Sequence, residues 1–222
     1  MDGVHDMGGM HGFGRAVWPG AERAYHERWE PRVFAIQMLV GLQRLGAGPG
    51  GRVTREEMEP TRYLAASYYE RWLYSAEQRL LRKGTISPGD VEAMMDRLSA
   101  GDAMPEHHDQ AMAERIVSDL RTPVPMGTPP TEARFAAGAR VRVKRMHAPG
   151  HTRCPRYARG AVGVVGSVRG VDRLPDRAVY GEKVDPEPVY SVEFSSEELW
   201  GPGEETPWTV SLDLWESYLE AA

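Results

Sequence analysis

A short turn in the second half of the chain gathers three arginines around a proline, in the order His151-Thr152-Arg153-Cys154-Pro155-Arg156-Tyr157-Ala158-Arg159-Gly160. Each guanidinium group is a planar fork that can donate paired, charge-assisted hydrogen bonds to an oxyanion. Such a turn therefore suits phosphate, carboxylate or oxidised sulfur. The environment of Cys154 would favour a thiolate if the side chain were exposed, but no base accompanies it, so we interpret it as an ordinary cysteine.

A second cluster, Tyr68-Tyr69-Glu70-Arg71-Trp72, lies in a predicted helix. Tyr68 and Trp72 share one face of that helix, and Tyr69 lies about 100° away from them. Core packing is the ordinary interpretation of a helical aromatic stripe. Two adjacent tyrosines fit a wholly buried site less well, because both hydroxyl groups need hydrogen-bond partners. The residues alone leave both interpretations open.

The histidines do not predict a metal site in this chain. All seven are scattered, and Pro149-Gly150 between His147 and His151 excludes a helical chelate and leaves only a loop chelate open. The sequence also lacks a phosphate-binding loop, a dinucleotide fingerprint and a serine elbow. By its own residues the chain does not look like an enzyme.

Helical patterns position the aromatic cluster, and they predict a helical domain over residues 21–122. The patterns are residues 22–45 with a break at Pro31, a short helix opened by the capping-box spacing Thr54–Glu57, residues 63–83 ended by Gly84, a helix opened by Ser87-Pro88, and residues 105–120. The first twenty residues are rich in glycine and poor in periodic apolar side chains. Residues 1–20 are therefore predicted to form an extended arm that contacts a partner subunit.

The arginine turn belongs to a second predicted domain. Four prolines predict a linker over residues 123–133, and beyond it the hydrophobic period changes from about 3.6 to about 2. Alternating segments follow at residues 139–145, 160–170, 189–194 and 208–212. Residues 134–222 are therefore predicted to form a small SH3-like β-barrel, and the fold class is α+β.

The composition limits the class of protein. Hydrophobic residues make up 41% and charged residues 27% of the chain, which predicts an ordinary hydrophobic core. We find no apolar run of membrane-spanning length and no signal peptide, and the single cysteine fits a reducing compartment, so a cytoplasmic location is expected. Nine basic and no acidic residues between Arg134 and Arg169 would attract nucleic acid, but the net charge of −5 argues against a general nucleic-acid binder.

Five segments of the sequence resemble the β subunit of nitrile hydratases. They are Asp2-Gly3-Val4-His5-Asp6-Met7-Gly8-Gly9-Met10 with Gly12-Phe13-Gly14, Met58-x-Pro60-x-x-Tyr63-Leu64 with Tyr68-Tyr69-x-x-Trp72, Gly150-His151-x-Arg153 with Arg156-Tyr157 and Arg159-Gly160, Glu198-Leu199-Trp200-Gly201, and Asp213-Leu214-Trp215-Glu216-x-Tyr218-Leu219-Glu220. They occur in the expected order and cover essentially the whole chain. The family's architecture, a helical N-terminal half followed by an SH3-like barrel, agrees with the fold predicted above.

The resemblance implies an enzyme that hydrates nitriles to amides and that is active only as a complex with an α subunit. It also allows an α2β2 assembly, and it implies no nucleic acid or membrane partner. In that family a non-haem Fe(III) or Co(III) ion is held by the α subunit, in a Cys-x-x-Cys-Ser-Cys loop with two oxidised cysteines. This chain has no such loop. Its implied role is to close the active site and to hold those oxyanions.

The arginines implied to bond the oxidised cysteines are Arg153 and Arg52. Arg153 matches the arginine of the family's His-x-Arg turn. Arg52 matches an arginine six residues before the methionine of the Met-x-Pro motif. Gly50-Gly51 departs from the more apolar segment that precedes this arginine in the family.

The resemblance also implies roles for residues of the aromatic cluster. Tyr68 corresponds to a tyrosine that positions the substrate and transfers protons, and Tyr69 and Trp72 correspond to its neighbours in the substrate pocket. Glu56 matches an outer-shell acid. Arg71 stands where a histidine is common, so a proton relay through that position is not carried over.

Three rival interpretations accompany this one. An accessory protein that delivers the metal usually covers only part of the β pattern, whereas both halves are present here. In thiocyanate hydrolases, which are related cobalt enzymes, the two halves lie on separate chains, whereas here they are fused. A nucleic-acid-binding SH3-like module would use the basic stretch and would show a steep salt dependence of binding.

Overall fold

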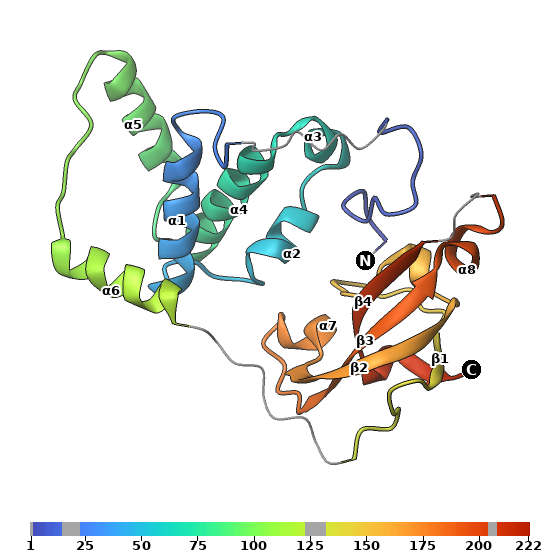
Figure 1. Ribbon diagram of the computed structural model, residues 1–222. Helices are drawn as coiled ribbons and strands as arrows, with labels where there is room; N and C mark the ends of the chain where they lie inside the picture. Colours follow the sequence, from blue (N-terminus) through green and yellow to red (C-terminus); the bar gives the residue numbers. More distant parts are fainter. Residues whose placement is uncertain (1, 15–22, 123–131, 204–207) are drawn as a thin grey trace. The chain divides into compact units, whose positions relative to one another are not determined.

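The computed structural model describes residues 2–14, 23–122, 132–203 and 208–222, and it contains two compact units. One unit, Trp18–Val124, is helical, and the other combines Met1–Val17 with Pro125–Ala222 and contains the sheet (Figure 1). A helical N-terminal half followed by a β-rich C-terminal half is as predicted. Residues 123–131 of the predicted linker lie outside the described residues.

Helix α1 (Glu30–Leu42) begins one residue before Pro31, so this proline starts the helix rather than breaking it. Proline suits the first turn of a helix because its missing N–H would have no intrahelical acceptor there. The predicted helical pattern over residues 22–45 is therefore wrong for residues 23–29, and residue 22 lies outside the described residues. Val33 and Val40 lie on the buried face of α1.

Helix α2 (Gly51–Glu56) begins earlier than predicted, with Gly50 as its N-cap. The prediction that Thr54 opens this helix is wrong. Thr54 lies inside α2, and its hydroxyl donates a 3.1 Å hydrogen bond to the carbonyl of Pro49. The amide of Glu57, which a Thr54 cap would bind, donates a 3.2 Å hydrogen bond to the carbonyl of Val53 instead.

The predicted helix over residues 63–83 is two helices, α3 (Pro60–Ala65) and α4 (Tyr68–Lys83). Ser67 is the N-cap of α4, and its side chain accepts a hydrogen bond from the amide of Glu70. The Glu70 carboxylate accepts a 2.6 Å hydrogen bond from the Ser67 amide in return. This capping box makes Tyr68 the first residue of α4.

The remaining helices follow the predicted boundaries more closely. Gly84 ends α4 in the left-handed region, with φ of 71°. Ser87 caps α5 (Pro88–Ser99) as predicted, and α6 (Gln110–Arg121) begins later than predicted because Asp109 caps it. Within the described ranges, no helix is both long and apolar enough to cross a membrane.

Five antiparallel strands form one sheet in the order β4-β3-β2-β1-β5. Their bounds are β1 (Arg140–Val143), β2 (Val162–Arg173), β3 (Pro186–Ser195), β4 (Thr209–Trp215) and β5 (Leu219–Ala221). Four strands overlap the four predicted segments. The short connecting elements are η1 (Arg156–Ala158), α7 (Pro175–Ala178), α8 (Ser196–Trp200) and η2 (Glu216–Tyr218).

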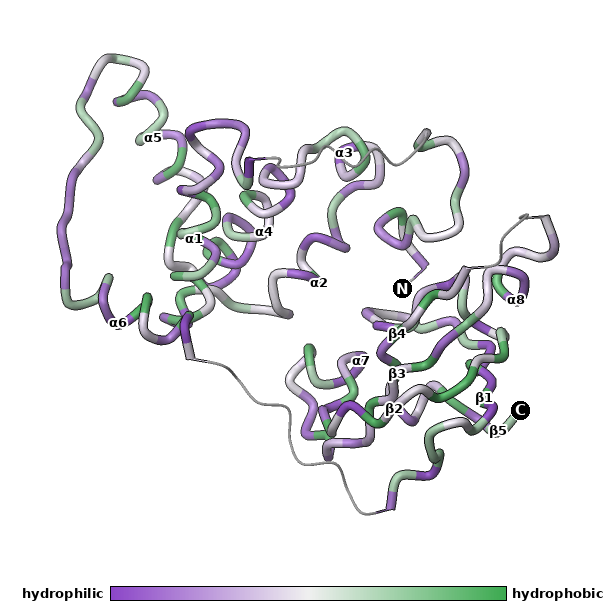
Figure 2. The backbone as a smooth tube through the Cα atoms, in the orientation of Figure 1, coloured by the Kyte–Doolittle hydropathy of each residue, from purple (hydrophilic) through white to green (hydrophobic). Residues whose placement is uncertain are grey.

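The core of this unit contains buried side chains from all five strands. Hydrophobic and hydrophilic residues alternate along β1 (Figure 2), and Val141 and Val143 are fully buried while Arg140 and Arg142 are exposed. Among the described residues β4 and β5 are the edge strands, so hydrogen bonds do not close the sheet. Closure into an SH3-like barrel stays a prediction.

The described part of the N-terminal arm packs on the sheet unit. Asp2 forms an ion pair with Arg159 of the arginine turn. Gly8 lies against the ring of Tyr157, and a Cβ at this position would overlap that ring. Glycine therefore allows the arm to lie close to the sheet unit. A contact between the arm and a partner subunit stays a prediction.

Candidate functional site

The helical unit brings Arg52, Tyr68 and Trp72 together around one small pocket with a volume of about 150 Å³. Arg52 comes from α2. Tyr68 and Trp72 come from adjacent turns at the start of α4, where residues four apart share a helix face. Helices α2 and α4 thus bring together three of the residues to which the resemblance assigned a role.

The aromatic side chains around this pocket form a continuous cluster. The ring centroids of Tyr68 and Trp72 are 5.5 Å apart, and those of Tyr68 and Tyr69 are 5.1 Å apart. Tyr25 extends the cluster beyond Tyr69. Tyr68 is 60% exposed, whereas Tyr69 and Trp72 are half-buried. Core packing therefore does not explain an aromatic residue at position 68. It does explain the buried parts of the Tyr69 and Trp72 side chains.

Three further side chains line the same pocket, namely Arg55, Tyr63 and Arg71. The guanidinium carbon of Arg55 lies 5.1 Å from the centroid of the Trp72 ring. Arg71 donates a 2.9 Å hydrogen bond through Nε to the carbonyl of Tyr63, and its guanidinium carbon lies 4.3 Å from the centroid of that ring. Arg55 was missed at the sequence level, although it stands three residues after Arg52 and thus on the same face of α2.

Glu56 is not among the described residues that line the pocket. It is half-buried and follows Arg55 on α2. Burial, and next the positive charge of Arg52, lower the pKa of Arg55, while the carboxylate of Glu56 acts weakly in the opposite direction. The outer-shell role of Glu56 stays a prediction.

Arg153 belongs to the sheet unit, and its side chain is exposed. The hydroxyl of Tyr218 fixes the backbone of its turn, because it accepts a 3.2 Å hydrogen bond from the Arg153 amide and donates one to the carboxylate of Asp176. The hydroxyl of Thr152 lies 3.4 Å from the same oxygen. Burial, and next the hydrogen bond to Asp176, raise the pKa of Tyr218 far above its usual range. The turn is therefore supported by a hydroxyl that stays protonated.

Arg159 points inwards, and its side chain is only 5% exposed. It donates hydrogen bonds to the carbonyls of Cys154 at 3.1 Å and Met146 at 3.0 Å, and it pairs with a carboxylate of the arm. Arg159 therefore supports the turn from inside, and Arg153 and Arg156 are the arginines of the turn that could meet an anion. The side chains of Arg153 and Arg156 are exposed.

Cys154 and the neighbouring histidines do not build a metal centre. Cys154 is buried, and burial raises the pKa of its thiol to about 11, so the thiol is protonated at neutral pH. Nδ1 of His147 lies 2.7 Å from the carboxylate of Asp2, and His151 is buried. In the part of the chain that the structure describes, no group of three His, Cys, Asp or Glu side chains could hold a metal ion.

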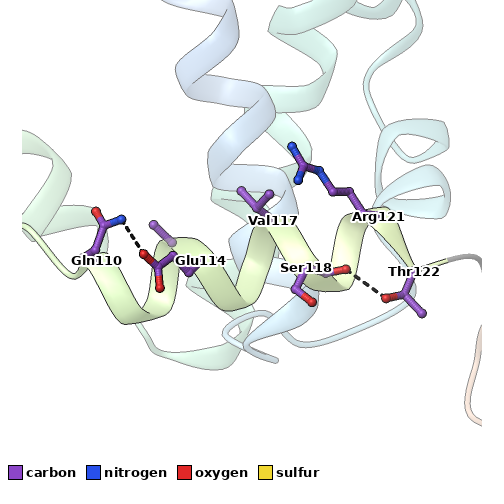
Figure 3. Close-up of a pocket in the computed structure, with 7 residues that line it drawn as sticks. Gln110, Glu114, Val117, Ser118, Arg121 and Thr122 are labelled. Atoms are coloured by element: carbon purple, nitrogen blue, oxygen red, sulfur yellow. Dashed lines mark hydrogen bonds between the residues drawn. The ribbon is translucent and has the colours of Figure 1, made fainter.

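A separate hollow runs along α6 (Figure 3) and is lined by residues of that helix and its C-cap. Two hydrogen bonds within it are local, from Gln110 to Glu114 at 2.8 Å and from Thr122 to the carbonyl of Ser118 at 2.9 Å. Binding sites usually draw converging polar groups from several elements. This hollow therefore does not resemble one.

Comparison with known families assigns both units of the chain. The family model described as "Nitrile hydratase beta subunit, N-terminal" matches residues 1–117, and "Nitrile hydratase beta subunit, C-terminal" matches residues 125–221. The chain belongs to the nitrile hydratase β-subunit family. It is therefore a member of a family of enzyme subunits that act with an α subunit.

Relatives at full length agree with this assignment. "Nitrile hydratase subunit beta" of Pseudomonas putida is 32% identical and that of Rhodococcus erythropolis 34% identical, each over 100% of both chains. "Low-molecular weight cobalt-containing nitrile hydratase subunit beta" of Rhodococcus rhodochrous is 32% identical over 99% of both chains. A solved thiocyanate hydrolase from Thiobacillus thioparus covers 53% of this chain and 100% of its own at 23% identity, with a TM-score of 0.42, which is too distant to inform function.

Proposed function

We propose that this chain closes the active site of a nitrile hydratase, in a complex with an α subunit that hydrates nitriles to amides. The observation that carries the proposal is the pocket where Arg52, Tyr68 and Trp72 meet. Aromatic walls with a few polar donors suit a small organic substrate, since the rings contact carbon atoms while the donors orient a polar group.

The metal is proposed to be bound by the α subunit and to be cobalt or iron. Two relatives are named as cobalt-containing. When Co(III) or Fe(III) is bound in the complex, it supplies Lewis acidity for the hydration. The residues of this chain are assigned no step at the metal itself.

Arg153 and Arg52 are proposed to bind the oxidised cysteine ligands of the α subunit. Both side chains are exposed in their own units. Guanidinium forks donate charge-assisted hydrogen bonds of about 2.7–2.9 Å to oxyanions, and fixed donors lose little freedom on binding. Tyr218 supports this role for Arg153, because its hydroxyl holds the backbone of the turn.

Tyr68 is proposed to position the nitrile and to move a proton. A phenol can donate or accept a hydrogen bond, and the Tyr68 ring is flanked by Tyr69 and Trp72, which are proposed as pocket walls. Glu56 is proposed as an acid that supports the pocket from its outer shell. The exposed Phe13 of the arm supports a contact between the arm and the α subunit.

The proposal is tested by co-expressing this chain with its α subunit in cobalt or iron medium. The expected result is a stable complex that contains metal and converts a simple nitrile to its amide, with no activity from either chain alone. A chain that transfers metal to the α subunit and then dissociates would instead be an accessory protein. Gel filtration of the complex also measures whether the αβ units pair into α2β2.

A further inference from the structure

The pocket at the start of α4 is lined by more guanidinium groups than the binding of one oxyanion requires. Arg52, Arg55 and Arg71 all line it. In the described ranges, no ion pair joins any of these three guanidinium groups to a carboxylate. Guanidinium groups stay charged at any ordinary pH. The pocket therefore gathers three guanidinium groups in a space of about 150 Å³, and the nearby carboxylate of Glu56 acts only weakly on Arg55.

Acidic residues close to the pocket in sequence are bound elsewhere. The carboxylate of Glu57 lies 2.7 Å from Nη2 of Arg82. Glu59 accepts hydrogen bonds from the first amides of α3, and Glu70 accepts one from the Ser67 amide. These carboxylates therefore have other partners than the arginines of the pocket.

Two of the three arginines are held in place by aromatic rings. Arg55 lies over the ring of Trp72, and Arg71 lies over the ring of Tyr63 with its Nε bonded to the Tyr63 carbonyl. A cation–π contact holds Arg55, and a cation–π contact together with one backbone hydrogen bond holds Arg71. Neither kind of contact neutralises the charge. The N–H donors of a guanidinium group lie in its plane, so a group held this way can still bind a carboxylate by its edge.

The combination of arginines and aromatic rings in this pocket favours an organic acid over an inorganic anion as the ligand. Tyr63, Tyr68 and Trp72 contribute aromatic surface to the same pocket as the arginines. An inorganic oxyanion has no carbon atoms for these rings to contact. A molecule with a short carbon chain and a terminal carboxylate would satisfy both kinds of wall.

We propose that Arg55 and Arg71 bind the carboxylate of the substrate, so that the enzyme prefers nitriles that carry a carboxylate group. This inference rests on the function proposed above and specifies the substrate class of the same pocket. Arg52 keeps its proposed role toward the α subunit. Arg55 and Arg71 are then specificity residues, which bind the end of the substrate that does not react.

The test compares 4-cyanobutyrate with 4-cyanobutyramide, which has the same shape and no charge, on the metal-loaded complex with the α subunit. The wild-type complex is expected to prefer the acid by about tenfold or more in kcat/KM, the range of a charged hydrogen-bonded pair. Arg71→Gln and Arg55→Gln are each expected to lower this acid-to-amide ratio about tenfold. Arg71→Lys, which keeps the charge but loses the fork, is expected to lie between wild type and Arg71→Gln.

The matched control is Arg62→Gln, which removes the same charge from a side chain that lies over Tyr74 and does not line this pocket. It should leave the acid-to-amide ratio unchanged. Co-purification with the α subunit and thermal unfolding check that each variant folds. If Arg71→Gln does not fold, Arg55→Gln alone tests the inference.

A wild-type complex that hydrates both nitriles with a ratio near one overturns the inference and leaves the proposed function intact. A preference that survives both Arg55→Gln and Arg71→Gln also overturns it. Competition by inorganic phosphate at constant ionic strength, together with a ratio near one, would indicate a general anion site instead. A complex that hydrates neither nitrile, and no uncharged nitrile either, overturns the proposed function and with it the inference.

Discussion

The hydroxyl of Tyr218 accepts a hydrogen bond from the amide of Arg153, and it thereby joins the arginine turn to the C-terminal end of the sheet. Tyr218→Phe removes that acceptor and the donor to Asp176 together. We expect the free energy of unfolding to fall by about 1–3 kcal/mol, because two partly buried polar groups lose their partner. Urea denaturation measures the change.

Tyr180→Phe is the control for this variant. Tyr180 is exposed, and its hydroxyl accepts a 2.9 Å hydrogen bond from the amide of His151. Its loss should cost less than the loss of the Tyr218 hydroxyl. Equal losses in the two variants would contradict the special support that we assign to Tyr218.

Arg153→Lys keeps the positive charge but removes the fork. We expect the complex with the α subunit to form, and kcat to fall at least about tenfold, because lysine cannot donate the paired hydrogen bonds. Steady-state kinetics of the purified complex measure the effect. Arg140→Lys, on the exposed face of β1, should have near-normal kinetics. Near-normal turnover by Arg153→Lys would contradict the proposed binding of the oxidised cysteines by Arg153.

Tyr68→Phe is expected to lower kcat more than it changes stability. The side chain is 60% exposed, so loss of its hydroxyl leaves no buried group without a partner. Kinetics of the complex and thermal unfolding of the same sample separate the two effects. Tyr74→Phe is the control on the same helix, since Tyr74 contacts Arg62 and does not line the pocket. Lost stability with unchanged kcat would make Tyr68 a structural residue.

Asp2 is expected to make the stability of the sheet unit depend on pH. Hydrogen bonds with His147 and Arg159 lower the pKa of the Asp2 carboxyl from 3.8 to about 2. Because the folded pKa is the lower one, the carboxylate stabilises the packed arm above a pH of about 4, and this contribution is lost as the pH falls toward about 2.

The measurement is the free energy of unfolding of wild type and Asp2→Asn at several pH values. The two proteins should differ at about pH 5 and converge as the pH falls toward about 2. Asp213→Asn is the control, because Asp213 and Arg169 are both half-exposed and lie 3.7 Å apart, and such surface pairs contribute little. A difference that does not change with pH would show that Asp2 is not the titrating group.

Local signals predicted much of the fold, and the errors have identifiable causes. Gly84 and Ser87 marked a helix end and a helix start correctly, because a left-handed glycine and a capping serine act on the adjacent turn. Ser67 and Glu70 have the same capping-box spacing, and reading it would have separated α3 from α4. Thr54 misled because the capping-box spacing Thr54–Glu57 occurs here within a helix that begins at Gly51.

Contacts between distant residues could not be read from the sequence. Nothing near Asp2 predicts that it pairs with Arg159, or that Arg159 is turned inwards by two backbone carbonyls. The resemblance singled out Arg52, Tyr68 and Trp72, which line one pocket and whose roles stay predictions. The shared pocket with Arg55 became visible only when α2 was packed against α4, where the Ser75 hydroxyl donates a 2.9 Å hydrogen bond to the carbonyl of Gly51.

The two segments of the sheet unit have a consequence for synthesis on the ribosome. The arm emerges before the helical unit, but the Arg156 amide that binds Asp6 follows 150 residues later. At ordinary translation speeds the arm therefore waits on the order of 10 s for its binding surface. The helical unit is made within that interval and can fold toward its end, while the arm is free for a nascent-chain chaperone to bind. Docking of the arm thus reports that the C-terminal strands have been made.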